Sequence, residues 1–133
     1  MSLKVDVSIG ELLDKLTILE IKSERIHDAA KTTNIQKELR ILRETWAASP
    51  YSATDVSAQI AQLKTINETL WEIEDDLRRL EAEQRFDDEF VRLARAVYRQ
   101  NDIRAALKKD LNTLLGSELV EVKSYVDYKA SYD

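Results

Sequence analysis

Residues 86–116, FDDEFVRLARAVYRQNDIRAALKKDLNTLLG, decide the fold, because they predict one long helix with an irregular inner face. The first half places its apolar side chains on one stripe at about 100° per residue, from Phe90 through Leu93 to Val97. Further along, the same stripe carries Asn101, Arg104 and Lys108 before leucines resume. This pattern predicts either a buried polar layer or a cleft that water can reach.

Residues 55–84 are predicted to form the partner helix of a long antiparallel hairpin. Apolar residues recur through this stretch with heptad-like spacing, and residues 85–87 make a tight turn with Asp87 as the N-cap of the next helix. At about 1.5 Å per residue the two helices form a hairpin on the order of 40 Å long. On the edge of the apolar stripe lie Asn67, Trp71, Glu74 and Arg78, spaced i, i+4, i+7 and i+11.

Folding the chain at Arg85 and Phe86 brings the polar residues of the two helices into one layer. Asn67 falls level with Arg104, and Glu74 lies about one turn from Asn101. Because an isolated buried charge is very costly, the cation of this layer requires a carboxylate partner, and we expect Glu74 and Glu20 to supply it.

Two shorter helices are predicted before the hairpin. Ser8 and Glu11 have capping-box spacing at the start of the first, and Thr33 and Gln36 have it at the start of the second, which runs to about residue 46. The turn at 49–52 contains the proline that ends it.

Ile18 and Ile21 lie well off the main apolar stripe of the first helix. This helix therefore contacts neighbours on two flanks, or its second flank meets another subunit.

The termini leave two alternatives open. Apolar residues alternate in residues 3–7 and again in 119–123, so the two stretches could form a minor two-stranded pairing. Tyr125, Tyr128 and Tyr132 instead keep helical spacing, and a helical tail would pack them on the bundle or on a partner. Gly116 is the expected end of the long helix. The sequence thus predicts an all-α protein, a single helical domain over residues 1–133 with a long hairpin and two shorter helices.

Composition narrows the functional classes. The net charge is −5, and residues 51–90 carry eleven acidic and four basic side chains, so we expect no nucleic-acid partner. There is no apolar run long enough to cross a membrane, and the absence of cysteine fits a cytoplasmic protein. His27 is the only histidine, so we predict no metal site, no cofactor and no catalytic triad.

Two hypotheses compete for the polar layer. In the first it is a closed network that fixes the register of the helices. In the second, Arg104 and Lys108 hold a small anionic ligand, with Trp71 as an apolar wall and the two asparagines orienting it. The candidate binding residues are Glu20, Asn67, Trp71, Glu74, Asn101, Arg104 and Lys108.

Four stretches resemble a small bacterial family of unknown function. They are VSIGELLDKLTILEIKSERI at 7–26, LWEIEDDLR at 70–78, FVRLARAVYRQNDIRAALKKDLN at 90–112 and GSELVEVKSY at 116–125. The resemblance spans nearly the whole chain and implies a stand-alone bacterial protein of about this length, without an activity or a ligand. The helical chorismate mutases share only the architecture, because their opening helix pattern is not matched here.

For function we expect a non-enzymatic module that acts by association, as a homodimer or with another protein. The off-stripe isoleucines and the tyrosine-bearing tail favour this interpretation. The alternative is a small-anion-binding protein or enzyme that uses the polar cleft between the long helices.

Overall fold

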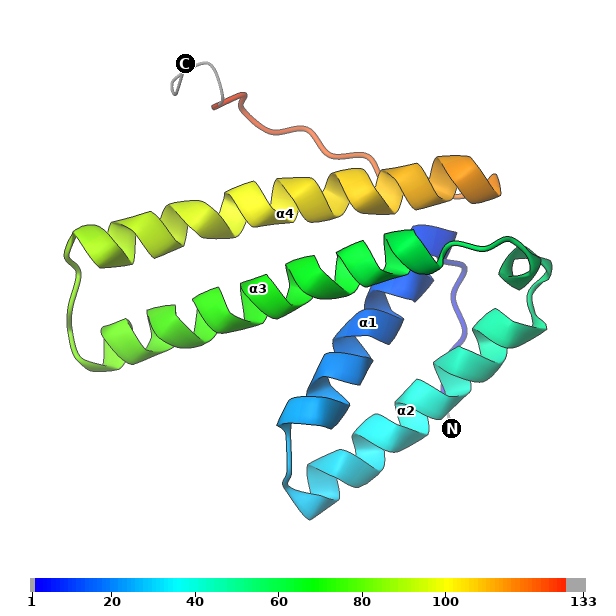
Figure 1. The fold of residues 1–133 in the computed structure, drawn as a ribbon, viewed down its shortest axis with the longest axis horizontal. Coiled ribbons are helices and arrows are strands. Elements are labelled where there is room, and N and C mark those ends of the chain that lie inside the picture. Colours follow the sequence, from blue (N-terminus) through cyan, green and yellow to red (C-terminus); the bar gives the residue numbers. More distant parts are fainter. Residues whose placement is uncertain (1, 129–133) are drawn as a thin grey trace.

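The computed structural model describes residues 2–128, and its organising feature is the predicted helix hairpin. α3 (Ser57–Ala82) and α4 (Asp88–Leu115) run antiparallel and side by side along their whole length (Figure 1). α1 (Ile9–Arg25) and α2 (Ala29–Ala48) form a shorter hairpin that crosses one end of the first, and η1 (Pro50–Ala53) connects α2 to α3. The all-α prediction is confirmed, since no residue between 2 and 128 belongs to a strand.

Local capping explains where the helices begin and end. The Ser8 hydroxyl accepts a hydrogen bond from the Glu11 N–H at 3.1 Å, and Asp87 accepts one from the Phe90 N–H at 3.3 Å, so both N-caps are as predicted. Gly116 ends α4 in the left-handed conformation, with φ at 66°.

The predicted start of the second helix is wrong. Asp28 accepts from the Lys31 N–H at 3.0 Å and starts α2 at Ala29, four residues before Thr33. The Thr33 hydroxyl donates instead to the Ala29 carbonyl oxygen at 3.0 Å, inside the helix.

The core lies where the two hairpins cross. Its most deeply buried side chains are Leu13, Leu39, Leu63 and Leu111, one from each long helix. The distal half of the α3–α4 hairpin extends beyond α1 and α2, and there its two helices pack on each other, with the tail lying along α4 (Figure 1). A cleft can therefore open at the point where α1 stops covering the hairpin.

α1 contacts α2 on one flank and both hairpin helices on the other. Ile21 is 1% exposed in the single chain, so its side chain is buried within the monomer. The expectation that it meets another subunit is therefore wrong. Of the two alternatives for the off-stripe isoleucines, the structure supports neighbours on two flanks.

Gly10 is where α1 comes closest to α4. A Cβ atom at this position would lie 2.6 Å from the Lys108 carbonyl oxygen and 3.0 Å from Asn112 Oδ1. The missing side chain lets the Gly10 N–H donate to Asn112 Oδ1 at 2.7 Å. Glycine at this position thus sets the distance between the two helices.

The expected pairing of residues 3–7 with 119–123 is absent, and so is the alternative of a helical tail, for the described residues up to 128. The tail runs back along α4 in an extended form (Figure 1). Glu121 accepts from Lys108 at 3.0 Å, and the Tyr128 hydroxyl donates to Asp102 Oδ2 at 2.5 Å, which raises the pKa of Tyr128 to about 12. These contacts hold the tail on α4 and away from residues 3–7. Tyr132 lies outside the described residues.

Replacing Gly10 tests the close approach. An alanine in a helix normally gains about 1 kcal/mol over glycine, but overpacking costs about 1–3 kcal/mol, so Gly10→Ala should lower the free energy of unfolding. Urea denaturation measures the change. Lys15→Ala, an exposed change on the same helix, should have an effect of only a few tenths of a kcal/mol. A Gly10→Ala protein more stable than wild type would contradict the steric account.

Candidate functional site

Asp14 is the centre of the polar layer between α1, α3 and α4. Its side chain is fully buried, with 0% exposure. Arg104 Nε donates to Asp14 Oδ1 at 2.9 Å, and Arg104 NH2 donates to Asp14 Oδ2. This two-pronged contact raises the pKa of Arg104 above its ordinary value, because the carboxylate stabilises the charged guanidinium.

Asn67 and Thr17 complete the hydrogen bonding around this carboxylate. Asn67 Nδ2 lies 2.9 Å from Asp14 Oδ1 and 2.9 Å from Thr17 Oγ1. The Thr17 hydroxyl in turn donates to the Asp14 carbonyl oxygen at 2.8 Å. Asn67 and Arg104 thus bind the same oxygen atom, which confirms the predicted register of the hairpin.

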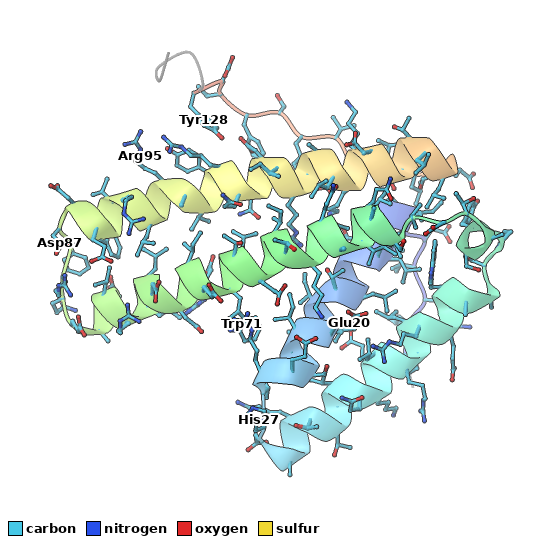
Figure 2. The ribbon with its side chains drawn as sticks, viewed as in Figure 1. Glu20, His27, Trp71, Asp87, Arg95 and Tyr128 are labelled. Carbon is cyan, nitrogen blue, oxygen red and sulfur yellow. The ribbon has the colours of Figure 1, made fainter. Side chains whose placement is uncertain are left out.

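The predicted carboxylate partners of Arg104 are wrong. Glu20, labelled on α1 in Figure 2, forms ion pairs with Arg43 and Lys64 at 3.7 and 3.6 Å. Glu74 pairs with Arg78 at 3.2 Å. Asp14 takes their place because α1 turns a second, polar stripe towards the hairpin. A signal for it exists in the sequence, since Gly10, Asp14, Thr17 and Ile21 are spaced i, i+4, i+7 and i+11.

Lys108 forms a second ionic cluster closer to the start of α1. Its ammonium donates to Glu11 Oε2 at 2.7 Å and to Glu121 Oε2 at 3.0 Å. Burial disfavours the charged form, but the two carboxylates outweigh it and raise the pKa of Lys108 above its ordinary value. Both cations of the layer therefore have carboxylate partners within the chain.

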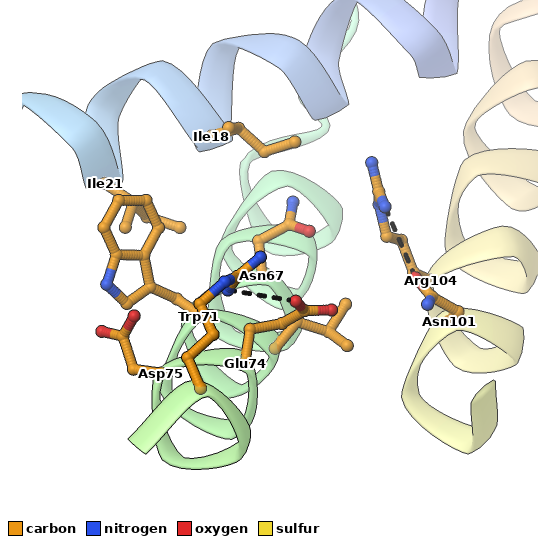
Figure 3. A pocket seen from close by; sticks show the side chains of 10 residues that line it. Ile18, Ile21, Asn67, Trp71, Glu74, Asp75, Asn101 and Arg104 are labelled. Carbon is orange, nitrogen blue, oxygen red and sulfur yellow. Dashed lines mark hydrogen bonds and ion pairs between the residues drawn. The ribbon is translucent and has the colours of Figure 1, made fainter. Parts of the chain in front are cut away.

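Beside the network lies an open cleft of about 370 Å³, which we call the α1–α3–α4 cleft (Figure 3). Ile18 and Ile21 close it from α1, α3 forms its floor, and α4 supplies the opposite wall. Five of the seven predicted site residues line it, namely Asn67, Trp71, Glu74, Asn101 and Arg104. Glu20 and Lys108 lie outside it. Leu70 and Asp75, which were not among the predicted binding residues, also line it.

The side chains that line the cleft combine hydrogen-bond donors, acceptors and an aromatic wall. Asn101 and Arg104 offer hydrogen-bond donors from α4, Glu74 and Asp75 offer acceptors from α3, and Trp71 provides an aromatic wall. His27 lies at the turn after α1 and does not reach the cleft (Figure 2). Within residues 2–128, no group of three His, Asp or Glu side chains is placed to hold a metal ion.

A model of the family described as "Family of unknown function (DUF6165)" matches residues 3–131. The chain belongs to this family. No curated protein and no solved structure matches the chain in comparisons of sequence and fold. The DUF6165 family thus agrees with the resemblance in the sequence motifs, and its description names no ligand or activity. Among the described helices of this DUF6165 protein, none is long and apolar enough to cross a membrane.

Arg104→Met tests whether the network is structural. The variant keeps the apolar stem and leaves Asp14 buried without a cation, so it should lose about 3–5 kcal/mol of unfolding free energy. Arg92→Met makes the same change on the same helix at an exposed ion pair with Glu89 and should lose less than about 1 kcal/mol.

A double variant separates the ion pair from packing. Adding Asp14→Asn to Arg104→Met removes the unpaired charge and should restore part of the lost stability, which a double-mutant cycle from urea titrations would measure. Equal losses in Arg104→Met and Arg92→Met would contradict the structural role.

Lys108→Met should cost less than Arg104→Met, about 1–2 kcal/mol, because Glu11 and Glu121 keep 38% and 43% of their side chains exposed and stay hydrated. The folded pKa of Lys108 is raised above 10.5, so its contribution is present below that pH and lost as the pH rises through the folded pKa. The stability gap between wild type and variant should therefore narrow in alkali. A gap that stayed constant would contradict this assignment.

Proposed function

We propose that this protein is a non-enzymatic helical module that acts by binding another protein chain, and that it forms a homodimer. Its contact surface consists of two extended terminal segments, residues 3–7 and 119–126. The motif resemblance supports a bacterial protein, and the absence of cysteine supports a reducing, cytoplasmic location.

The observation that carries the proposal is the exposure of apolar side chains on these segments. Leu3 is 93% exposed and Val122 is 87% exposed, and Val5, Tyr125 and Val126 are similarly open. Isolated exposed apolar residues are ordinary, but a run of them along two extended segments is typical of a surface that a partner covers.

The backbone of the same segments supports the proposal. Residues 3–7 and 119–126 make no backbone–backbone hydrogen bond in the described part of the chain. Their β-branched residues alternate with charged ones, the pattern of strands that bury one face. An extended segment of this kind binds by adding itself to a strand of a partner, and its unpaired N–H and C=O groups supply the affinity.

The two segments start close together in space. The Ile9 N–H donates to Ser117 Oγ at 3.1 Å, so each copy presents both segments from one end of the molecule. From there, residues 3–7 diverge from α4 while the tail follows it (Figure 1). Exchange of these segments between two copies would give each of them a partner and close the assembly as a symmetric dimer.

The polar network supports a non-enzymatic function. Asp14, Arg104, Glu11 and Lys108 are committed to one another at 2.7–2.9 Å in the contacts that join α1 to α4. Rearrangement of these groups during a reaction would weaken the contacts that join α1 to α4.

The small-anion alternative has less support. It needs Arg104 and Lys108 to be available, whereas each already contacts at least one carboxylate.

Size-exclusion chromatography with light scattering tests the association. Wild type should elute with twice the monomer mass, and Val5→Lys/Val122→Lys should be a folded monomer, because charge on the paired face prevents burial. Ile41→Lys/Val91→Lys adds the same charge at exposed apolar positions of α2 and α4 and should stay dimeric. Circular dichroism confirms the helicity of all three. A wild type that is monomeric at micromolar concentration, or dimeric Val5→Lys/Val122→Lys, would refute the proposal.

A further inference from the structure

We propose that the α1–α3–α4 cleft binds a small organic cation, whose amine or guanidinium group stacks on Trp71 and is held by Glu74 and Asp75. This site is lined by α1, α3 and α4 and adjoins the tail only at Asn101, so it does not depend on the association. The proposed ligand is a cation, whereas the sequence pattern suggested an anion.

The charge around the cleft favours a cation. The charged residues of the lining are two carboxylates, Glu74 and Asp75, and two guanidinium groups, Arg78 and Arg104. Behind the lining, the buried Asp14 carboxylate pairs with Arg104, while Glu74 pairs with Arg78. Each arginine already has a carboxylate partner, whereas Asp75 forms no ion pair with a described residue. The excess charge of the site is therefore negative.

A buried amide oxygen faces the cleft without a partner. Asn67 is 6% exposed, and its Nδ2 is fixed as the donor side because it contacts the Asp14 carboxylate. No described residue donates to Asn67 Oδ1. Within residues 2–128, every side-chain oxygen that is fully enclosed has a hydrogen-bond partner. Asn67 Oδ1 has none, so it is not fully enclosed, and the cleft that Asn67 lines gives access to it. It accepts a hydrogen bond from an N–H group of the ligand.

Trp71 provides the surface for the cation. Its indole ring lies between Ile21 and Asp75 at one end of the cleft (Figure 3). The Arg25 guanidinium carbon already lies 5.9 Å from the ring centroid, and Arg25 does not line the cleft, so the cleft side of the ring remains for a ligand. A cation over an indole with a carboxylate beside it is stabilised by both groups.

The α4 wall distinguishes two kinds of ligand with the same cationic group. Asn101 and Arg104 face α3 across the cleft (Figure 3), and the Arg104 NH1 contact to Asn101 Oδ1 is long, at 3.5 Å. Because Arg104 is occupied by Asp14, the Asn101 amide is the group of this wall that can donate to a carboxylate. A plain amine or guanidine would use only the α3 side, whereas an amino acid would use both walls.

Isothermal titration calorimetry with agmatine, putrescine and arginine tests the site, at an ionic strength held constant with sodium chloride. Wild type should bind agmatine at millimolar or lower concentration. Tighter binding of arginine would identify a zwitterion as the ligand, and tighter binding of agmatine a simple cation. Trp71→Leu, which keeps an apolar wall, should weaken binding on the order of tenfold.

Two charge variants serve as a matched pair. Glu74→Gln/Asp75→Asn should abolish binding, whereas Glu38→Gln/Glu44→Gln should bind like wild type. The control changes net charge equally, at exposed α2 residues that form no ion pair with a described residue. Circular dichroism checks that both remain folded. Failure of all three probes to bind wild type, retained binding in Glu74→Gln/Asp75→Asn, or binding of citrate in place of the cations would overturn the proposal.

Discussion

The ion pair between Asp14 and Arg104 is the constraint on which the arrangement of the helices depends. A fully buried carboxylate is tolerable only when its hydrogen bonds are satisfied, and Asp14 receives them from α3 and α4 together. The position of α1 along the hairpin and its rotation about its own axis are therefore coupled. A shift of one turn would separate Asp14 from Asn67 and Arg104 and leave its buried carboxylate without these hydrogen bonds.

Gly10 and Asp14 act together, one turn apart on the same face of α1. The close approach at Gly10 brings the α1 backbone to the Lys108 carbonyl oxygen, and Asn112 accepts from the Gly10 N–H. Helices that are close at this end diverge towards the other, because α1 crosses the hairpin at an angle (Figure 1). The cleft opens on the diverging side, where Ile18 and Ile21 are the residues of α1 that line it. The polar network and the cleft thus both result from the angle at which α1 crosses the α3–α4 hairpin.

The hairpin could be predicted from the sequence in some detail, because regular apolar spacing, the Asp87 cap and Gly116 are local signals. Its register followed from a single assumption, that polar residues on facing helices share one layer, and Asn67 and Arg104 confirm it. The partner of Arg104 could not be chosen in the same way. Glu20, Glu74 and Asp14 all lay within plausible reach of Arg104. The choice among them depends on how α1 is rotated about its axis, and the stronger apolar stripe of α1 does not indicate that rotation correctly. That stripe is buried in the core between α2 and the hairpin, whereas Asp14 lies on the side of α1 that meets Asn67 and Arg104.

Asp14 also changes what the polar layer can bind. In the sequence, Arg104 and Lys108 share one stripe of a helix and suggest a concentration of positive charge. In the folded chain, carboxylates from α1 and from the tail neutralise both cations. Glu68 and Glu72 of α3 pair with Arg25, so the guanidinium group over the Trp71 ring is neutralised as well. A cationic stripe on one helix therefore predicts an anion site only if no neighbouring element carries a buried carboxylate at the same level, and here α1 carries one.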